Sequence, residues 1–510
     1  MSETFYVTTP IYYVNARPHL GHAYTTIVAD LLARWHRRRG DRVWFLTGTD
    51  EHGDKIQKAA AAQGITPQAF TDDISGQFRT TWQQMGMSND DFIRTTEERH
   101  KKVVQAILQK IYDAGDIRKH AYGGLYCFGC ERFYKEDELV DGLCPDHKTK
   151  PEFIEEENYF FNMEKYRAQL VKHIEVFPDF IRPERYRNEV LAMLRDDIGE
   201  LCISRPKTRL EWGIELPFDK NFVTYVWFDA LLNYVSAPGW PDGEQFAAFW
   251  PACRHLIAKD IVKPHAIYWP TMLMAAGLPL YRQLFVHGYW NVDGTKMSKS
   301  LGNVRGALEL KDHYGTEAFR YFVLREMSFG LDANFSEDAL IGRLNSDLAN
   351  GIGNLTSRVC SMTQKYFPDG VDAGAAGTHG DALMQCACDL PAAIEPYMLA
   401  CKPDAALQEI WKVISEADGF VQEQQPFKLA KDPALRPQLA GIMRALLITI
   451  THIADALTPF LPETSAKIFA MLNVVPPPPG QTLAAEPLAP VHRVNGGGHL
   501  FERIREEKKN

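Results

Sequence analysis

The sequence contains no apolar run long enough to cross a membrane. A spanning helix needs about 20 mainly apolar residues. The most apolar stretch, residues 445–461, is interrupted by threonines, a histidine, an aspartate and a proline: Thr449, Thr451, His452, Asp455 and Pro459. The first residues also lack the basic and apolar segments of an export signal. These absences exclude a membrane-spanning protein and predict a soluble one in the cytoplasm.

An excess of positive charge is missing as well. The 56 Lys and Arg residues are outnumbered by 65 Asp and Glu residues, and the net charge of −9 excludes a protein that coats nucleic acid non-specifically. A local basic face could still bind RNA, but the basic run at residues 37–39 is interpreted as a solvated helix end. The 9 cysteines are an odd number scattered over 510 residues, which indicates a reducing compartment.

The first fifty residues predict a strand, a helix and a second strand. Residues 4–9 are rich in β-branched and aromatic side chains. Apolar residues then recur at three- and four-residue spacing from Leu20 to Trp35, the period of an amphipathic helix, and Gly40 is placed to end it. Residues 43–46 form a short apolar run typical of a buried parallel strand. A strand–helix–strand unit of this kind opens a Rossmann-like, doubly wound parallel sheet.

Later segments extend this α/β pattern and then replace it. Residues 255–258 and 284–287 predict further strands, whereas residues 75–111 look helical throughout. From residue 338 onward apolar residues follow helical spacing, which predicts an all-α bundle. We expect a catalytic domain in two halves, an inserted connective domain with a zinc knuckle, a linking helical region and a C-terminal helical domain. Their respective residues are 1–115 with 219–303, 116–218, 304–350 and 351–510.

Two histidines flank a short segment at the start of the first predicted helix. His19 and His22 are three residues apart, so both project from one side of the helix. The first turn of a helix carries unpaired N–H groups and a partial positive charge that favour phosphate. Gly21 has no side chain to keep a ligand from the backbone. The segment predicts a triphosphate site; the alternative is that both histidines only cap and pack the helix.

A loop with two lysines follows a strong hairpin signal at Asp293-Gly294. It reads Lys-Met-Ser-Lys-Ser and contains Lys296, Ser298 and Lys299. Lysines on a mobile loop can neutralise the negative charge that develops on phosphoryl oxygens. The alternative is a solvated surface loop. The prediction of a phosphate-binding loop is strengthened because the histidine pair occurs in the same chain.

Three cysteines and a histidine have the spacing of a metal site. Cys127 and Cys130 form a C-x₂-C pair, and Cys144 and His147 form a C-x₂-H pair. Three thiolates and one imidazole complete a tetrahedral Zn²⁺ site and leave no position open for catalysis, so the metal would be structural. The alternatives are a redox-active C-x-x-C pair, which lacks a thioredoxin-like context here, and chance.

The two phosphate-handling motifs occur in a fixed order, and in this the chain resembles the class I aminoacyl-tRNA synthetases. Residues 19–22 are similar to the His-Ile-Gly-His motif of that family, and residues 296–300 match its Lys-Met-Ser-Lys-Ser motif. Within the class, the chain resembles the methionyl-tRNA synthetase family over nearly its whole length. The stretches that carry this resemblance are residues 9–15, 48–53, 225–231, 259–261 and 354–358.

The resemblance implies roles for particular residues. Asp50 would hold the ammonium group of methionine, and Asp260 the ribose of ATP. The pocket for the methionine side chain would be aromatic and aliphatic, which suits a polarizable thioether; its residues are Ile11, Tyr13, Trp227, Ala230, Leu231, Tyr234, Ile261 and His265. The anticodon would bind Asn354, Arg358 and Phe427, the last at a position where relatives often have tryptophan.

The resemblance thus predicts an enzyme that activates L-methionine with ATP and Mg²⁺, releases pyrophosphate and esterifies initiator and elongator tRNA(Met). His19 and His22 would bind the triphosphate, and Lys299, helped by Lys296, would stabilise the transition state. Gly21 and Ser298 would also contact ATP. Two alternatives remain open: a class I synthetase for another amino acid, such as cysteine, leucine or valine, and a non-catalytic RNA-binding zinc protein. No extra RNA-binding or dimerising segment follows the helical part, so we expect a monomer.

Overall fold

The computed structural model describes residues 2–15, 17–127, 132–134, 136–145, 148–292, 294–296, 305–372 and 377–504. The chain divides into two compact units. The sheet unit comprises Thr4–Pro18 and Trp44–Val286. The helical unit comprises Met1–Glu3, His19–Val43 and His287–Asn510.

A six-stranded sheet with the order β3-β2-β1-β11-β12-β7 forms the centre of the sheet unit. Strand β2 pairs with β3, β1 with β11 and β12 with β7, and all three pairings are parallel. The strands are β1 Thr4–Tyr13, β2 Arg42–Asp50, β3 Asp91–Arg94, β7 Ile181–Arg182, β11 Cys253–Ala258 and β12 Gln283–His287. The predicted parallel sheet is confirmed. The prediction of helix throughout residues 75–111 is wrong, because β3 interrupts it.

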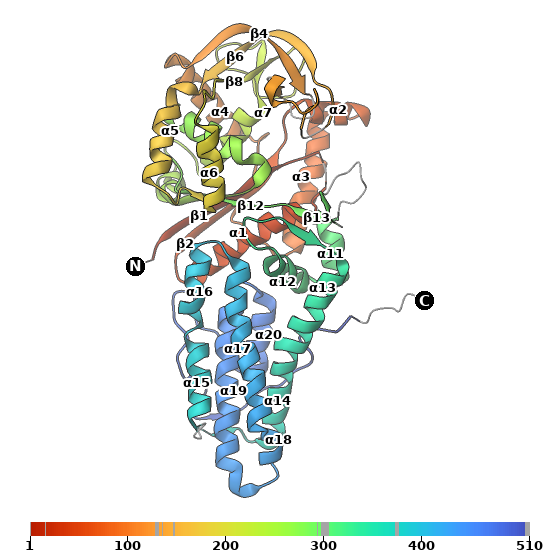
Figure 1. Ribbon diagram of the computed structural model, residues 1–510, viewed down its shortest axis with the longest axis vertical. Helices are drawn as coiled ribbons and strands as arrows, with labels where there is room; N and C mark the ends of the chain where they lie inside the picture. The colour runs from red at the N-terminus through yellow and green to blue at the C-terminus, as the bar shows by residue number, and fades with distance from the viewer. Residues whose placement is uncertain are drawn as a thin grey trace. The chain divides into compact units, whose positions relative to one another are not determined.

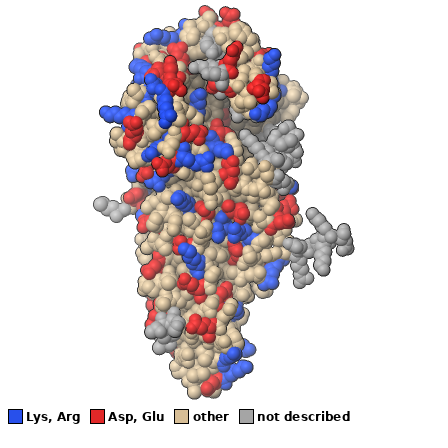
Figure 2. All heavy atoms as spheres, in the orientation of Figure 1, with Lys and Arg blue, Asp and Glu red and all other residues tan. Residues whose placement is uncertain are grey.

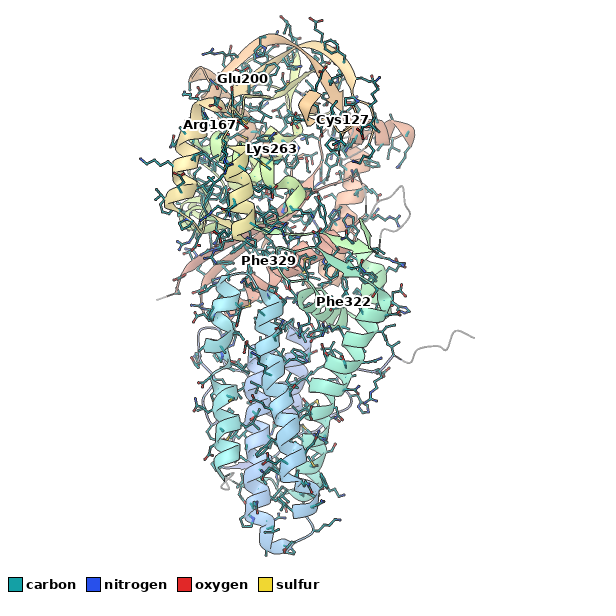
Figure 3. All side chains as sticks on the ribbon, in the orientation of Figure 1. Cys127, Arg167, Glu200, Lys263, Phe322 and Phe329 are labelled. Atoms are coloured by element: carbon teal, nitrogen blue, oxygen red, sulfur yellow. The ribbon has the colours of Figure 1, made fainter. Side chains whose placement is uncertain are left out.

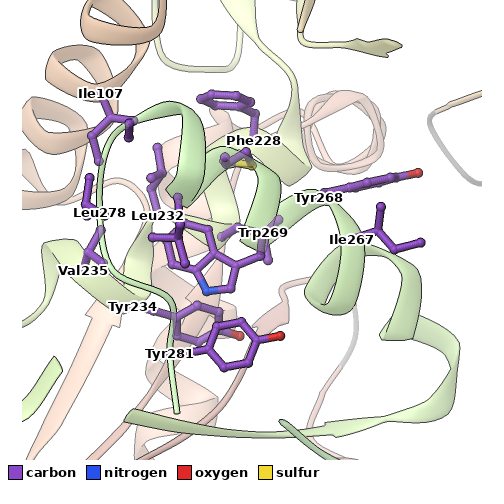
Figure 4. Close-up of a cluster of buried hydrophobic side chains, with 14 of the residues drawn as sticks. Ile107, Phe228, Leu232, Tyr234, Val235, Ile267, Tyr268, Trp269, Leu278 and Tyr281 are labelled. Carbon is purple, nitrogen blue, oxygen red and sulfur yellow. The ribbon is translucent and has the colours of Figure 1, made fainter. Parts of the chain in front are cut away.

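The helices of the sheet unit connect these strands, and α5 and α6 lie side by side (Figure 1). They are α2 Asp54–Ala62, α3 Pro67–Gln84, α4 Glu98–Asp113, α5 Glu164–Val176, α6 Glu184–Met193, α7 Val226–Leu231, α8 Asn233–Ser236, α9 Glu244–Phe249 and α10 Trp269–Ala275. The apolar faces of α4 to α10 join one core, whereas Ile56 and Ala60 of α2 pack with Phe70 of α3 in a smaller cluster. Figure 4 shows Tyr234, Tyr281 and Trp269 close together in the larger core, each no more than 1% exposed.

A separate four-stranded sheet is inserted between α4 and the later strands, with the order β5-β4-β6-β8. Its strands are β4 Ile117–Cys127, β5 Arg132–Tyr134, β6 Glu152–Asn162 and β8 Glu200–Cys202, and they pair antiparallel. A further antiparallel pair follows, β9 Ser204–Pro206 with β10 Phe222–Thr224. This insertion lies within the residues predicted for a connective domain.

The helical unit begins with α1, Leu20–Arg38, at the position predicted from its apolar period. Gly40 follows with φ of +84° and Gly294, between the antiparallel strands β13 and β14, has φ of +75°. The short strands are β13 Trp290–Val292, β14 Thr295–Lys296, β15 Ala333–Phe335, β16 Val371–Asp372 and β17 Val491–His492. The other helices are α11 Ala307–Tyr314, α12 Thr316–Glu326, α13 Glu337–Arg343, α14 Asn354–Tyr366, α15 Gly377–Cys388, α16 Leu390–Leu399, α17 Pro403–Gln424, α18 Pro426–Leu429, α19 Arg436–Leu457 and α20 Pro462–Leu472.

Helices α14 to α20 form the predicted bundle, in which α15 and α17 run along the central α19 (Figure 1). The segment Pro433–Leu457 is long and apolar enough to cross a membrane, but 94% of its apolar window is buried inside the protein. A bundle's core helix has this character. Consistent with this packing, the apolar residues at helical spacing that begin the helical part are all buried, at 4% exposed or less: Leu344, Leu348, Ile352, Leu355 and Val359.

The interpretation of residues 37–39 as a solvated helix end is wrong. The guanidinium of Arg38 donates two hydrogen bonds from Nη2 to the carboxylate of Asp455 in α19, at 2.8 and 3.0 Å. Arg39 pairs with Glu395 at 2.7 Å and lies over the ring of Trp35. The C-terminal end of α1 is therefore fastened to the bundle.

Candidate active site

The first histidine motif forms the N-terminus of α1. His19 is the N-cap residue, and its Nδ1 accepts a hydrogen bond from the backbone N–H of Gly21 at 3.1 Å. The rings of His19 and His22 stack with their centroids 3.6 Å apart and their planes inclined by 22°. The prediction that both imidazoles share one side of the helix is confirmed. They lie where a helix offers backbone N–H groups to an anion.

The chain that follows the second motif returns to the first. The backbone N–H of Leu20 donates to the carbonyl of Arg305 at 3.0 Å, and His19 forms an antiparallel bridge with Gly306. The structure thus brings the residues that follow the Lys-Met-Ser-Lys-Ser segment against the histidine motif. A phosphate site shared by the two motifs requires this juxtaposition.

The second motif itself is described at one position. Lys296 is the last residue of β14. Ser298 and Lys299 lie outside the described residues. Their expected contacts with phosphate stay predictions.

A buried histidine binds Thr25, which lies one helical turn after the glycine of the first motif. The Oγ1 atom of Thr25 is 3.2 Å from the carbonyl oxygen of Gly21 and 2.8 Å from Nε2 of His287. Nδ1 of His287 donates to the carbonyl of Gly288 at 2.7 Å, which leaves Nε2 as an acceptor. Burial lowers the pKa of His287 to about 4, so the ring is neutral. Thr25 and His287 were not predicted, because single polar residues within apolar strands and helices form no local motif.

The residues predicted to hold methionine follow the carboxyl ends of strands in the six-stranded sheet. Ile11 and Tyr13 lie at the end of β1, and Asp50 is the last residue of β2. Ile261 and His265 belong to the turns that follow β11. Ligands of open α/β sheets bind at this edge. Helices α7 and α8 add the remaining predicted residues, Trp227, Ala230, Leu231 and Tyr234.

We call the side chains predicted to hold methionine the methionine patch, and several of them pack against one core cluster of the sheet unit. Ile11, Tyr13, Trp227 and Ile261 are partly buried and pack against the core cluster that contains Leu231 and Tyr234. The rings of Trp227 and His265 are 6.2 Å apart and nearly perpendicular. The structure thus places Trp227 and Tyr234 beside His265, and a shared pocket for the whole predicted set stays a prediction.

A tyrosine–histidine pair lines this patch. Nδ1 of His265 donates to the carbonyl of Ile261 at 2.9 Å, since a carbonyl can only accept. Nε2 of the neutral ring therefore accepts from the hydroxyl of Tyr234 at 2.8 Å. Burial lowers the pKa of His265 to about 4 and raises the pKa of Tyr234. Both groups are neutral near pH 7, which suits an uncharged thioether.

A second buried histidine lies behind Tyr234. Nε2 of His255 accepts from the indole N–H of Trp269 at 3.1 Å, so Nδ1 carries the proton and donates to Thr8 at 2.8 Å. The rings of His255 and Tyr234 are 4.2 Å apart. Burial lowers the pKa of His255 well below its ordinary value. This polar layer fixes the ring of Tyr234 from behind and was not predicted.

The residue after Asp50 fixes the end of β2. Glu51 is 0% exposed, and its two oxygens accept hydrogen bonds from Arg94 at 2.7 and 2.9 Å. The hydroxyl of Thr96 donates to the same carboxylate at 2.6 Å. A bidentate pair of this kind has a defined geometry. The backbone that carries Asp50, which is 9% exposed, is therefore rigid.

Asp260 lies in the turn Lys259–Ile261, directly after β11, and is exposed. Strand β11 pairs with β1 in the sheet. The carboxylate therefore stands at the same edge of the sheet as the predicted methionine pocket, where a nucleotide ribose could reach it.

The predicted anticodon residues lie in the helical bundle. Asn354 is the exposed first residue of α14, and Arg358 follows one turn later. Arg358 donates to Asp418 at 2.9 Å, a partner that the sequence did not reveal. Phe427 is 48% exposed in α18, after Gln425 has ended α17 with φ of +47°. Figure 2 shows positive and negative side chains interspersed over this face of the bundle rather than a continuous basic surface.

Two of the four predicted zinc ligands are described, Cys127 at the end of β4 (Figure 3) and Cys144. Both are at most 1% exposed and share a small cluster with Tyr134. Thr149 contacts both: its hydroxyl is 3.9 Å from Sγ of Cys127, and its carbonyl accepts from the backbone N–H of Cys144 at 2.9 Å. Cys130 and His147 lie outside the described residues.

Comparison with known proteins points to one family. The family model for class I tRNA synthetases (M) matches residues 5–150 and 146–360. The methionine–tRNA ligase of Caldanaerobacter subterraneus is 45% identical over all of this chain and 80% of its own length. That of Streptomyces coelicolor is 43% identical over 93% of this chain and 90% of its own length.

Solved structures agree with the sequence relatives. Mycobacterium tuberculosis methionyl-tRNA synthetase in complex with methionyl-adenylate matches with a TM-score of 0.93 and 37% identity, over 98% of this chain and 100% of that one. Its apo form matches with a TM-score of 0.86 and 34% identity, over 99% of each chain.

Proposed function

The chain belongs to the methionine–tRNA ligase family of class I tRNA synthetases, and from this premise we propose a role for each part of its site. The enzyme activates L-methionine with ATP, forming methionyl-adenylate and releasing pyrophosphate, and then transfers methionine to tRNA(Met) for protein synthesis. The methionine carboxylate attacks the α-phosphate, so no protein nucleophile is needed. Catalysis rests on positioning and on charge stabilisation.

We propose that ATP lies between the two motifs. The residues assigned to it are His19, Gly21, His22, Asp260, Lys296, Ser298 and Lys299. The stacked imidazoles bind the triphosphate at the helix N-terminus, and Lys299, with Lys296, offsets the charge that grows on the phosphates in the transition state. Mg²⁺ enters with the nucleotide, since this ion prefers phosphate oxygens and water. The Leu20–Arg305 hydrogen bond supports this arrangement.

Methionine then lies beside the carboxyl edge of the sheet. Asp50 pairs with its ammonium group. The thioether contacts the aromatic and aliphatic side chains of the patch described above, since sulfur packs favourably on aromatic rings. The neutral Tyr234–His265 pair supports this assignment. A thioether cannot pair with a charged group, and this pair carries no charge.

For the tRNA we propose that Asn354 and Arg358 hydrogen-bond to anticodon bases and that Phe427 stacks on one of them, a contact worth roughly 1–3 kcal/mol. The exposure of Asn354 and Phe427 supports these roles. The five-part division of the chain given above, a monomeric state and a cytoplasmic location belong to the same proposal.

We also propose one structural Zn²⁺ held by Cys127, Cys130, Cys144 and His147. The two described ligands support such a site, because both are buried thiols of one small cluster and thiolates are preferred zinc ligands. When bound, the ion cross-links the loops that follow β4 and precede β6.

The observation that carries the proposal is the hydrogen bonding of the first motif, at His19–Leu20, to Arg305–Gly306, which follow the second motif closely, within a chain of this family. The test is ATP–pyrophosphate exchange with each of the twenty amino acids, with zinc measured on the same sample. We expect rapid exchange with methionine alone and one zinc ion per chain. Faster exchange with another amino acid, or no exchange and no AMP with any of them, contradicts the proposal.

A further inference from the structure

Asp229 is a buried carboxylate that joins histidines from two other segments of the sheet unit. It lies in α7 and is 0% exposed. Its Oδ2 is 2.6 Å from Nδ1 of His52, and its Oδ1 is 2.7 Å from Nε2 of His100. Burial acts to raise the pKa of Asp229, but the charges and hydrogen bonds of both histidines outweigh burial and lower it below its ordinary value. The carboxylate is therefore ionised and accepts from both rings.

The far side of His100 closes the network onto α8. Its Nδ1 is 2.8 Å from Oγ of Ser236, which is 3.3 Å from the carbonyl oxygen of Asn233. The single hydroxyl proton of Ser236 serves one of these two contacts, and the tautomer of His100 decides which. The side-chain amide of Asn233 donates to the carbonyl of Ala230 at 2.7 Å. The network thus returns to the helix that carries Asp229.

The hydrogen-bond network of Asp229 joins two segments that are assigned to methionine binding. His52 follows Asp50 by two residues, and Asp229 stands between Trp227 and Ala230. The Asp229–His52 bond therefore ties the segment assigned to the ammonium group of methionine to the helix assigned to its side chain. The binding of a ligand that is held at both ends depends on the distance between these two segments.

We propose that Asp229 is a positioning residue for methionine: through His52 it sets the spacing between Asp50 and the α7 wall of the pocket. Asp229 acts through His52 and not by touching the substrate. This inference rests on the proposed methionine site. In the network a buried, hydrogen-bonded carboxylate has a task beyond stability, since it holds two segments of a binding pocket together.

The first test is Asp229→Asn in the full-length enzyme. An amide oxygen can still accept from one ring, but its NH₂ group then faces the N–H of the other, so the two segments separate. We expect the KM for methionine in pyrophosphate exchange to rise by about 10- to 100-fold, the cost of a misplacement near 1 Å. The KM for ATP should change less than about twofold, because ATP is assigned to other residues.

Asp116→Asn is the matched control. Asp116 is a buried carboxylate of the same unit, 4% exposed, and it pairs with Lys165 at 2.6 Å and with Tyr166. We expect this variant to lose stability without a change in the KM for methionine. Active-site titration corrects both variants for inactive protein. An unchanged methionine KM in Asp229→Asn, in an enzyme whose wild type uses methionine, overturns the inference but leaves the proposed function intact.

Two substitutions at His52 keep the inference testable if Asp229→Asn does not fold. The amide nitrogen of asparagine can take the place of Nδ1, so His52→Asn should keep the methionine KM within about threefold of wild type. His52→Leu has no donor and should raise this KM as Asp229→Asn does. Equal KM values for the two His52 variants overturn the inference. If the wild type shows no methionine-dependent exchange, the proposed function itself fails.

A double-mutant cycle with Asp50→Asn completes the test. If Asp229 acts through Asp50, then Asp229→Asn should change the methionine KM by less than about threefold in the Asp50→Asn background. A full additional loss there contradicts the route through Asp50.

Discussion

At the scale of single residues, the direction of hydrogen bonds decides what the proposed methionine pocket accepts. Nδ1 of His265 is committed to a backbone carbonyl, so its Nε2 can only accept the hydroxyl proton of Tyr234. The pair therefore presents neither a charge nor a spare N–H to a ligand. A sulfur atom, which is a weak acceptor, loses little in such surroundings.

Tyr234→Phe should destabilise the protein. The substitution leaves the buried Nε2 of His265 without its donor, which costs about 1–3 kcal/mol. Urea denaturation measures this as a lower free energy of unfolding, and the KM for methionine should rise with it. The control is Tyr112→Phe, since Tyr112 is 37% exposed and keeps its stacked ring on Phe218. Wild-type stability in Tyr234→Phe would show that the hydroxyl has no role.

Lys299→Ala should slow methionine activation while leaving methionine binding intact. Removing one charge that acts in the transition state costs about 10²- to 10³-fold in rate. Pyrophosphate exchange gives the rate, and the change in tryptophan fluorescence on adding methionine gives the affinity. Lys412→Ala, in an exposed pair with Glu409, is the control and should match wild type. Equal exchange rates for Lys299→Ala and wild type would remove Lys299 from the mechanism.

Which site residues the sequence reveals depends on whether they form local motifs. His19, His22 and Asp50 stand in short runs of chemically informative residues and were predicted. Asp229 stands in a run that also yielded Trp227 and Ala230, but its partners His52 and His100 lie 177 and 129 residues away. Spacing along the chain cannot reveal pairs of this kind, because folding alone brings them together.

At the scale of elements, α1 is the best predicted and the most heavily anchored. Its period was legible within twenty residues, whereas β3 has only four residues and resembles any short apolar stretch of a helix. The role of Arg38 was misread because its partner Asp455 is 417 residues away. The local sequence pattern thus predicts that a long helix or strand exists. The contacts of its polar residues depend on partners that are far away in the sequence.

A buried ion pair also fastens the middle of α1 to α12. Asp30 is 0% exposed; its carboxylate lies 2.6 Å from Nη1 of Arg320 and 2.8 Å from Nε of Arg34. Arg320, 3% exposed, also donates to the carbonyls of Pro459 and Phe460. Breaking one side of such a pair leaves an uncompensated charge in the interior.

Asp30→Asn should therefore lower the free energy of unfolding by about 3–5 kcal/mol. Urea denaturation at pH 7 measures it. Asp312→Asn is the control, because Asp312 is exposed and its pair with Lys311 should contribute less than about 1 kcal/mol. A loss of similar size in both variants would show that the Asp30 pair is no more important than a surface one.

At the scale of the whole molecule, buried neutral histidines make stability depend on pH. Burial lowers the pKa of His265 and of His287 to about 4, and lowers that of His255 further below its ordinary value. In the unfolded chain a histidine binds its proton near pH 6.5. Below that pH the unfolded chain binds more protons than the folded one, so acid favours unfolding.

The free energy of unfolding should fall between pH 7 and pH 5, by about 2 kcal/mol at pH 5 for each such histidine. Carboxylates with lowered pKa values, such as Asp229 and Asp219, weaken the fold only in stronger acid. Burial raises the pKa of Glu317 and Asp418, and their protonation in the folded chain acts in the opposite direction, so the histidine substitutions below separate the two effects. Urea denaturation at pH 7, 6 and 5 measures the slope. His265→Gln should reduce the slope, and His499→Gln, at an exposed position, should not. A pH-independent free energy over this range would contradict the neutral state of the buried rings.

The link between Leu20 and Arg305 joins two main-chain atoms, and this hides it from ordinary mutagenesis. Alanine substitutions at positions 20 and 305 would leave the amide and the carbonyl in place and would report nothing about this hydrogen bond. Proline at position 20, which has no N–H, is the one natural substitution that deletes the donor. Homologous enzymes can therefore have other side chains at positions 20 and 305 and still form the same main-chain hydrogen bond.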